Sequence, residues 1–344
     1  MDPYTLGVFS NAYPASGKDS SGVHIRRMVD RLREKGVEVR LAVKTSRSVL
    51  GYLPFFSASV RLARDPSVEI LQAHYIPHSG LVPSLLKGER PLVIKFHGDD
   101  GRIFPFKNPL YRAVTRSMIR RADFVLTVSE EIRRLIVSLG ADEGRTAAIS
   151  SGVHTGKYVP MDRDACRAKW GLPADRPVAL FIGRLHPWKG VSEILRAAAD
   201  HPGCTFVLAG PGQVPDHPPN CRVTGMIEPD SVVSLINAAD VGILPSYTEG
   251  ISNFLMECLS CAVPVIATGV GGTPELVEDG KTGILIRPRD AGALSAALGR
   301  LLDSPAERAR MGRDGREDMI RRYDEGMLVD RMIGIHRSLL EGGR

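Results

Sequence analysis

The sequence predicts an α/β protein with two doubly wound parallel sheets. Short apolar runs alternate with helical patterns along the chain, which is typical of parallel strands that are buried on both faces. The alternation starts with residues 4–9 and starts again with residues 178–182. A chain of 344 residues with 43% hydrophobic content can form two cores. We therefore expect two α/β domains.

The first half contains apolar runs that we expect to be strands, at residues 4–9, 37–43, 68–73, 92–96, 124–128 and 146–149. A loop with glycine and serine, residues 10–22, separates the first run from an amphipathic helix that ends near Lys35. Ser21 and Gly22 open this helix, so their amides could meet a phosphate or an acceptor. The loop lacks G-x-G-x-x-G and G-x-x-x-x-G-K-[ST]. Neither a dinucleotide oxidoreductase nor a P-loop NTPase is supported.

The second half repeats this pattern, with expected strands at residues 178–182, 206–209, 223–227, 240–245, 264–267 and 283–286. From there to Arg344 the chain is helical and rich in charge. Parallel strands align their carboxyl ends at one edge of a sheet, and open α/β sheets bind their ligands at that edge. The loops that follow these strands are therefore the first places to look for a site.

The loop at residues 246–252 follows one such strand. A helix begins near Asn253, with Ser252 or Asn253 as its cap, and its free amides and dipole favour an anion. Glu257 lies about one turn along this mostly apolar helix, roughly 6 Å from its start. A nucleotide diphosphate at the helix start could place its ribose near Glu257. Glu249 would then face whatever is attached beyond the phosphates.

Two other loops carry related signals. Residues 264–267 lead into a loop with three glycines, whose backbone can approach a ligand closely. We expect Thr273 to be the N-cap of the next helix, with Pro274 as its first residue. After residues 178–182, Arg184 and Lys189 are spaced to clamp two phosphates, Arg184 by a forked contact and Lys189 as a point charge.

His97 ends another expected strand, in the sequence KFHGDD. It lies at a carboxyl edge, where it is either a site residue or an ordinary hydrogen-bonding residue at a strand end. Asp99 and Asp100 complete this stretch. Adjacent aspartates also occur in metal-dependent transferases, but those need D-x-D in a different context.

Composition and charge exclude several classes. The chain has no run of 18 apolar residues and no secretory signal at its start, so we expect a cytoplasmic protein. Five scattered cysteines argue against a disulfide framework, and Cys258 and Cys261 are expected to pack within a helix. His74 and His78 have metal-like spacing, but Pro77 breaks a helix there and no third ligand is evident.

The basic charge is concentrated in the first half. Residues 1–155 contain 23 Lys and Arg against 15 Asp and Glu, whereas the remainder contains 22 against 24. A segment that we expect to be helical combines apolar residues with Lys107, Arg112, Arg116, Arg120 and Arg121. This segment either contacts an anionic membrane or an acidic acceptor, or is the solvated face of an ordinary helix.

The second half also contains a run of motifs that resembles a known family. The order E-G-x-x-N-x-x-x-E, P-V-I-A-T and G-G-x-P-E-L-V, over residues 249–277, resembles the donor-site signature of glycosyltransferase family 4. The string G-R-L-x-x-x-K-G at residues 183–190 resembles the diphosphate motif of the same family. Family members are retaining, sugar-nucleotide-dependent enzymes of the GT-B fold, in which two Rossmann-like domains face a central cleft.

The resemblance implies a domain division and a set of roles. Residues 1–155 with about 325–344 would bind the acceptor, and residues 156–324 the nucleotide sugar; residues 150–160 match the interdomain joint. The catalytic group would be His97, Arg184, Lys189 and Glu249. Donor-binding residues would be Gly22, Arg184, Lys189, Met226, Ile227, Glu249, Gly250, Ile251, Ser252, Asn253, Phe254, Leu255 and Glu257. Acceptor-side candidates would be Gly17, Asp99 and Asp100, with the choice between Gly17 and Gly22 as the loop glycine left open.

The expected function is transfer of a hexosyl unit, with retention, from a UDP- or GDP-sugar to a lipid-linked, polysaccharide or small-molecule acceptor, in cell-envelope or glycan biosynthesis. Arg184, Lys189 and the amides of the helix start would replace a metal, so we expect no cofactor and no metal ion. We expect no nucleic-acid partner, and the basic domain could contact the inner face of a membrane. The alternatives are a nucleotide-sugar epimerase or hydrolase of the same architecture, or a non-catalytic sugar-nucleotide-binding protein.

Overall fold

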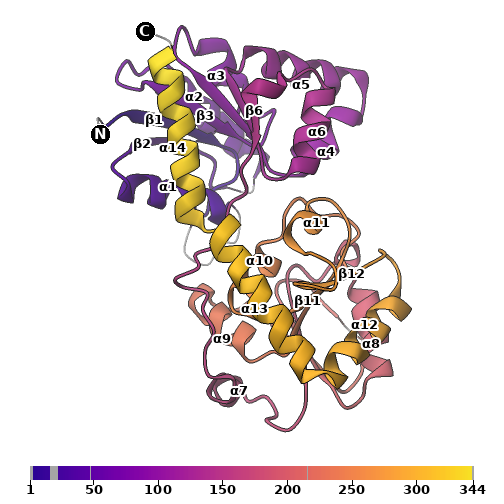
Figure 1. The fold of residues 1–344 in the computed structure, drawn as a ribbon. Coiled ribbons are helices and arrows are strands. Elements are labelled where there is room, and N and C mark those ends of the chain that lie inside the picture. Colours follow the sequence, from indigo (N-terminus) through magenta and orange to yellow (C-terminus); the bar gives the residue numbers. More distant parts are fainter. Residues whose placement is uncertain (1–2, 16–21, 47, 215, 343–344) are drawn as a thin grey trace. The chain divides into compact units, whose positions relative to one another are not determined.

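The computed structural model describes residues 3–15, 22–46, 48–214 and 216–342. The chain divides into two compact units (Figure 1). The first consists of Met1–Ser151 and Glu325–Arg344, and the second of Gly152–Asp324. Each unit is built around one six-stranded sheet whose strands are all parallel, which confirms the predicted fold class.

The sheet of the first unit has the strand order β2-β1-β3-β4-β5-β6. Its strands are β1 Thr5–Ser10, β2 Glu38–Val43, β3 Ile70–His74, β4 Leu92–Phe96, β5 Phe124–Thr127 and β6 Thr146–Ala148. The helices and 3-10 turns are α1 Val23–Glu34, η1 Val49–Gly51, α2 Tyr52–Arg64, α3 Leu81–Leu86, α4 Asp99–Arg102, η2 Phe104–Phe106, α5 Pro109–Arg121, α6 Glu130–Ser138, η3 Glu143–Arg145 and α14 Glu325–Gly342. Central strands β1, β3 and β4 are buried along their whole length, as both-face burial of a parallel sheet requires.

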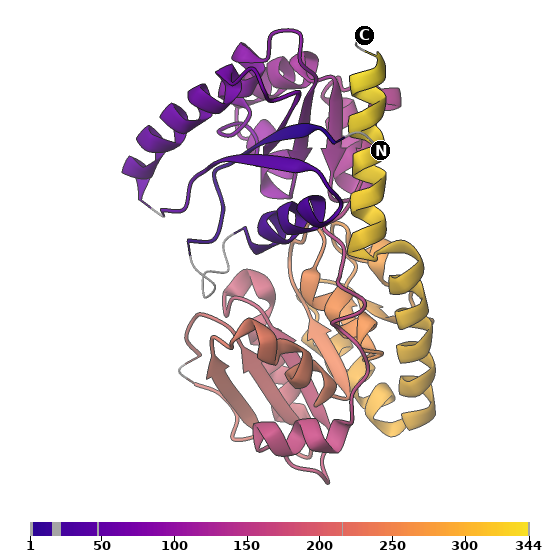
Figure 2. The ribbon, with the colours of Figure 1, turned by 90° about the vertical axis from the view of Figure 1, so that its left-hand side faces the viewer.

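Helices cover both faces of this sheet. α1 packs beside α14, although about 290 residues separate them in sequence, and both views show the two helices next to each other (Figures 1 and 2). α2, α3 and α5 pack in a row with one another. Leu328, Val329 and Met332 of α14 belong to the same hydrophobic core as the strands. α14 is therefore a core element of the first unit.

The sheet of the second unit has the order β12-β11-β10-β7-β8-β9. Its strands are β7 Val178–Ile182, β8 Thr205–Ala209, β9 Cys221–Gly225, β10 Val241–Leu244, β11 Val265–Thr268 and β12 Gly283–Ile286. Its helices and turns are α7 Arg163–Trp170, η4 Pro187–Lys189, α8 Val191–Asp200, η5 Pro229–Ser231, α9 Val232–Asn237, α10 Asn253–Ser260, α11 Thr273–Leu276, α12 Ala291–Asp303 and α13 Pro305–Arg322. All six strands are parallel, but the chain adds β8 and β9 on one side of β7 and β10 to β12 on the other, so the strand order reverses between β7 and β10, which makes that point the topological switch.

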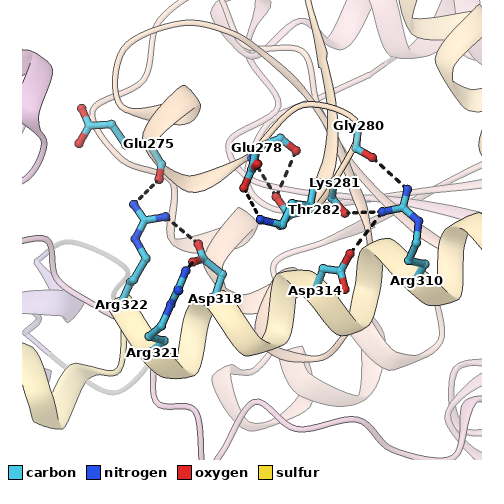
Figure 3. A network of polar contacts seen from close by, with 10 residues as sticks. All are labelled: Glu275, Glu278, Gly280, Lys281, Thr282, Arg310, Asp314, Asp318, Arg321 and Arg322. Carbon is cyan, nitrogen blue, oxygen red and sulfur yellow. Dashed lines mark hydrogen bonds and ion pairs between the residues drawn. The ribbon is translucent and has the colours of Figure 1, made fainter.

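Polar contacts fasten α13 to the segment that contains α11 and leads to β12 (Figure 3). Arg322 donates to the carbonyl of Glu275 in α11 at 3.1 Å, and Arg310 donates to the carbonyl of Gly280 at 2.9 Å. Arg310 is held in turn by Asp314, one turn along the same helix. These contacts tie the loop next to β11 to a long helix.

Two local predictions were wrong. Thr273 is the first residue of α11 and Gly272 is the N-cap, without a side-chain hydrogen bond, because the chain is already helical at Thr273. Lys107 lies outside α5, between η2 and the helix, because Asn108 caps the backbone amide of Tyr111 and Pro109 starts the helix there. Among the residues that the structure describes, no helix is long and apolar enough to cross a bilayer.

Candidate active site

Three loops of the second unit leave adjacent strands at the carboxyl edge of the sheet. β10 lies between β7 and β11, so the loops after these strands are neighbours. Tyr247 in the β10 loop donates its backbone N–H to the carbonyl of Trp188 in the β7 loop at 2.8 Å. Gly272 in the β11 loop donates to the carbonyl of Gly250 at 2.8 Å. The predicted donor-site segments therefore form one continuous surface within this unit.

Gly190 allows the β7 loop and the β10 loop to approach each other closely. Its φ is +71°, and a Cβ atom there would lie 2.1 Å from the carbonyl oxygen of Pro245. Both the left-handed backbone and the contact exclude any larger residue. Glycine at this position brings the start of α8 against the end of β10.

Lys189 and Glu249 form an ion pair across the two loops. The distance between Nζ and Oε1 is 2.5 Å, and the Glu249 side chain is only 9% exposed, compared with 31% for Lys189. Arg184 is exposed. The site therefore presents one cation held against a nearly buried carboxylate and a second cation that is open to solvent.

Helix α10 begins where its sequence predicts. Ser252 is the N-cap, and its hydroxyl accepts from the amide of Leu255 at 3.3 Å. Asn253 is exposed, whereas Phe254 and Leu255 are buried in the core. Glu257 is half-buried on this helix and Ile251 packs against the same core. The start of α10 therefore offers backbone donors and a positive dipole end next to the Lys189 and Glu249 pair.

Two hydroxyls at this edge were not predicted as site residues. Ser246 Oγ and Thr273 Oγ1 are buried and have no hydrogen-bond partner among the described residues. A buried polar atom without a partner is costly, so each is suited to a ligand or an ordered water. Both residues lie in loops that the sequence indicates as site loops. Serine and threonine are common in turns and helix caps, however, so their presence there does not by itself indicate a ligand-binding hydroxyl.

The aromatic ring of Tyr247, in the β10 loop, interacts with two charged side chains. The Tyr247 hydroxyl donates to Glu193 Oε1 at 2.7 Å, and the Arg289 guanidinium lies 4.9 Å from the centre of the Tyr247 ring. The hydrogen bond to Glu193 raises the pKa of Tyr247. Met226, which was predicted to lie near the nucleobase, is 57% exposed just after β9, and Ile227 packs against the core.

The first unit contains the other predicted residues. His97 directly follows β4, and its ring is stacked on Tyr75 with centroids 4.4 Å apart. Burial lowers the pKa of His97 well below its usual value, so the imidazole is neutral. Gly22 is the N-cap of α1 with a φ of +68°, and a Cβ there would lie 2.2 Å from the carbonyl oxygen of Ala12. Gly17 lies outside the described residues.

Asp100 differs from Asp99 in its surroundings. Its carboxylate accepts backbone N–H groups from His97 at 2.9 Å, Gly98 at 2.8 Å and Ile76 at 3.2 Å. Burial raises its pKa to about 6, although these N–H groups act in the opposite direction. Asp100 therefore shapes the loop that follows β4. Asp99 is exposed.

An open cavity of about 410 Å³ lies beside these aspartates. Its lining includes Asp99, Asp100, His78, Asn11 and Lys107. Asn11 Oδ1 is buried and has no hydrogen-bond partner among the described residues. The cavity thus combines an acceptor atom that lacks a donor with charges of both signs. In the described parts of the chain, no three His, Cys, Asp or Glu side chains lie together as a metal site would require.

Two family models match the chain. The model described as "Glycosyl transferase 4-like domain" matches residues 11–152, and the model described as "Glycosyl transferases group 1" matches residues 162–318. Each match falls almost entirely within one of the two units.

Curated relatives agree with these matches. A D-inositol 3-phosphate glycosyltransferase of Acidothermus cellulolyticus is 33% identical over 255 residues, which are 65% of this chain and 56% of the relative. The protein of the same name in Mycobacterium tuberculosis (strain ATCC 25177 / H37Ra) is 34% identical over 211 residues, 56% of this chain and 44% of the relative. The chain spans about half the length of the curated relatives it matches.

Solved structures share the fold at low sequence identity. A sucrose-phosphate synthase from Thermosynechococcus elongatus has a TM-score of 0.84 at 21% identity and covers 99% of this chain and 100% of its own. HepE of Anabaena, solved in complex with UDP-glucose, has a TM-score of 0.76 at 19% identity, covering 97% and 99%. With both units matched by family models and the fold shared over nearly the whole chain, the chain belongs to the glycosyltransferases of group 1 and family 4 type, and its fold is GT-B.

Proposed function

We propose that this protein transfers a sugar, with retention of anomeric configuration, from a nucleotide diphosphate sugar to a hydroxyl of an acceptor. The observation that carries the proposal is the pairing of Lys189 with Glu249 beside the capped start of α10. A cation, a carboxylate and free backbone amides at a topological switch point suit a diphosphate and the group attached to it.

The charges define the proposed roles in the second unit. Arg184, Lys189 and the amides of Asn253 and Phe254 would stabilise the diphosphate as it leaves, each charged hydrogen bond contributing about 1.5–3 kcal/mol, while the Leu255 amide donates to the Ser252 cap. Glu257 would hold the ribose hydroxyls. In this proposal no divalent ion is needed, because the cations and the helix start carry the negative charge of the leaving group.

In the first unit we assign His97 to a hydroxyl of the transferred sugar and the 410 Å³ cavity to the acceptor. Asn11 Oδ1 lacks a hydrogen-bond donor among the described residues, and an acceptor hydroxyl could provide one. The departing phosphate oxygen would take the proton from the attacking hydroxyl, so no protein nucleophile is assigned.

The names of the related proteins suggest which substrates to test first. HepE was solved in complex with UDP-glucose, and the curated relatives are named D-inositol 3-phosphate glycosyltransferases. We propose a UDP-sugar as donor and a phosphorylated polyol as the first acceptor to examine, ahead of lipid-linked and polysaccharide acceptors. A GDP-sugar is the alternative donor.

A thermal-shift panel of UDP-, GDP- and ADP-sugars tests the donor. A ligand present at 100 times its Kd stabilises the native state by about 2.7 kcal/mol, so one nucleotide should raise the melting temperature clearly more than the others. The variant Glu257→Ala should weaken that shift and raise the KM for the donor. If no nucleotide sugar changes the melting temperature of the wild-type protein, the proposal fails.

Product analysis separates transfer from its alternatives. Incubation of the protein with the donor alone should leave the sugar nucleotide unchanged except for slow hydrolysis, whereas addition of an acceptor should release the nucleotide and form a glycoside. Epimerised or rapidly hydrolysed donor without an acceptor would identify an epimerase or a hydrolase. Tight binding without turnover across many acceptors would identify a non-catalytic protein.

We also propose a peripheral contact of the first unit with an anionic membrane. Leu110 is 67% exposed at the start of α5, Phe106 is 41% exposed just before it, and the Arg112 guanidinium lies 5.6 Å from the centre of the Phe106 ring. Apolar side chains beside cations suit an anionic lipid surface. The protein should sediment with phosphatidylglycerol vesicles but not with phosphatidylcholine vesicles, and Leu110→Asp should reduce that binding. Equal binding to both kinds of vesicle would contradict the proposal.

A further inference from the structure

A series of hydrogen bonds runs through the interior of the first unit and ends at His97. The Tyr4 hydroxyl lies 2.7 Å from His336 Nδ1, and His336 Nε2 lies 2.7 Å from Gln72 Oε1. Gln72 Nε2 lies 2.8 Å from His74 Nε2, and His74 Nδ1 lies 2.9 Å from His97 Nε2. The series joins α14 to β3 and to the residue that follows β4.

The orientation of the Gln72 side-chain amide determines which group donates and which accepts at each hydrogen bond of this series. Its Nε2 atom also lies 3.6 Å from Met28 Sδ and 3.5 Å from Met332 Sδ. A thioether sulfur can accept a hydrogen bond but cannot donate one. The amide nitrogen therefore faces the sulfurs and His74, and the amide oxygen faces His336.

The proton positions follow from this orientation. Burial lowers the pKa of His336 to about 3 and the pKa values of His74 and His97 well below their usual value, so each ring is neutral and carries one N–H. His336 must donate from Nε2 to the amide oxygen, so its Nδ1 accepts from Tyr4. His74 accepts at Nε2 and must donate from Nδ1 to His97. His97 then accepts at Nε2, which leaves its own proton on Nδ1.

Ring packing holds the same imidazole in place. The His97 ring is stacked on Tyr75, and its centroid lies 5.0 Å from that of His24. The Tyr75 hydroxyl lies 2.8 Å from His24 Nε2, so these two rings also hold each other. Among the described residues, no group hydrogen-bonds to His97 Nδ1. The nitrogen that carries the proton is therefore the one left available for a ligand.

We propose that His336, Gln72 and His74 are positioning residues that keep His97 in its Nδ1–H form, so that this N–H donates to a hydroxyl of the transferred sugar. The proposal rests on the function proposed above. It gives a role in the reaction to a residue on α14 that touches neither substrate. A histidine without such a partner favours the Nε2–H form in water, so the series imposes the less common tautomer.

The first test is the tautomer itself, measured on the full-length protein. Nitrogen-15 NMR of histidine-labelled protein distinguishes a protonated ring nitrogen from an unprotonated one. The wild-type protein should show His97 protonated on Nδ1 only, near neutral pH. Protonation on Nε2 in the wild type would overturn the proposal, with no variant needed.

The second test changes the middle of the series. Gln72→Leu keeps a similar volume but removes both amide contacts, and His97 should then shift toward the Nε2–H form. Tyr4→Phe is the matched control, because it removes only the terminal hydroxyl and leaves the Gln72 orientation fixed by the two sulfurs. His97 should keep its Nδ1–H form in Tyr4→Phe.

Kinetics test the consequence for the reaction. Gln72→Leu should lower kcat about tenfold, which corresponds to the loss of one hydrogen bond, while the Kd for the donor nucleotide stays within twofold. An altered tautomer with unchanged kcat would overturn the positioning role. Absence of transfer by the wild-type protein would instead refute the proposed function, and the NMR result would still decide whether the series sets the tautomer.

Discussion

The ion pair between Lys189 and Glu249 is the centre of the candidate donor site, and its energetics depend on the unequal exposure of the two side chains. Glu249 is 9% exposed, so it depends on Lys189 for compensation of its charge. Lys189 is more exposed and can reach a ligand without leaving its partner. A residue that both neutralises a carboxylate and faces a diphosphate should be sensitive to any substitution.

Lys189→Ala should therefore reduce kcat strongly, by about 10²-fold, because it removes a cation from the leaving group and leaves a nearly buried carboxylate without its partner. Arg184→Ala should also lose turnover. Lys157→Ala is a suitable control, since Lys157 pairs with Asp230, which is 95% exposed, in the same unit. Steady-state transfer kinetics provide the measurement, and full turnover in either site variant would contradict the proposed clamp.

Gly190 allows a second test at the scale of one residue. Gly190→Ala should destabilise the second unit by more than about 2 kcal/mol, because the left-handed backbone costs about 1–2 kcal/mol and the clash with Pro245 adds to it. Gly280→Ala is the matched control, with a φ of +74° and nothing within 4 Å of the added Cβ. Urea unfolding measures both. If both variants lost the same free energy of unfolding, the contact between the added Cβ atom and Pro245 would not destabilise the protein.

At the scale of the element, the attachment of α14 to α1 depends on a carboxylate at the start of α14. Glu325 is 6% exposed in its side chain and accepts from Arg27 at 2.6 Å and Arg31 at 2.7 Å. Lys35 and Asp330 form a second pair between the same helices, but Asp330 is 61% exposed. The two pairs differ mainly in burial.

Glu325→Ala should lower the stability of α14 on the first unit by about 1.5–3 kcal/mol, since two guanidinium groups lose a nearly buried partner. Asp330→Asn should lower the same stability by less than about 1 kcal/mol, because the ion pair of Asp330 with Lys35 is exposed to solvent. Native-state hydrogen exchange of the amides from Leu328 to Ile333 measures this difference. If the two variants lost equal protection, burial would not be the deciding factor.

The elements were predictable to within one or two residues because each strand is an apolar run between turn residues. Residues 92–96, 178–182 and 283–286 are strands with the predicted bounds. The start of α10 was predictable because Ser252 is a common N-cap before an apolar helix. Thr273 was misplaced because Gly272 can occupy the same cap position without a side-chain hydrogen bond.

At the scale of the whole molecule, the two units differ in how they bury histidine. Burial lowers the pKa of His24 and His336 to about 3 and that of His74 and His97 well below the usual value. By solvent exposure, His74 and His336 of the first unit are buried and His24 and His97 are half-buried, whereas the described histidines of the second unit are half-buried or exposed and none is fully buried. The first unit should therefore respond more strongly to acid.

The sign of the response follows from proton binding. Below pH 6.5 these four imidazoles bind protons in the unfolded chain but remain neutral in the folded protein. The free energy of unfolding therefore falls as the pH falls, by up to about 1.4 kcal/mol per pH unit for each group. Asp100, with its pKa raised to about 6, opposes this below pH 6 but is only one group. Hydrogen exchange at pH 7 and pH 5 should show a greater loss of protection in the first unit. An equal loss in both units would contradict this.

The sequence could not reveal the interior hydrogen-bond series, because its members lie far apart. His336 and Gln72 are separated by 264 positions, and neither belongs to a motif with fixed spacing. The pairing of Lys189 with Glu249 was also invisible, although each residue was predicted for the site, because it depends on how closely Gly190 brings two loops together. Short-range patterns thus indicate the elements, while contacts between distant segments require the fold.

The placement of α14 has a consequence for synthesis on the ribosome. Residues 1–151 leave the exit tunnel first, yet the apolar side chains Leu328, Val329 and Met332 that complete their core are translated only after the entire second unit. The second unit is continuous in sequence and can finish folding while the nascent N-terminal segment still exposes apolar surface. Of the two units, the one whose synthesis starts earlier should therefore be the later to become fully native, and the more dependent on chaperones until then.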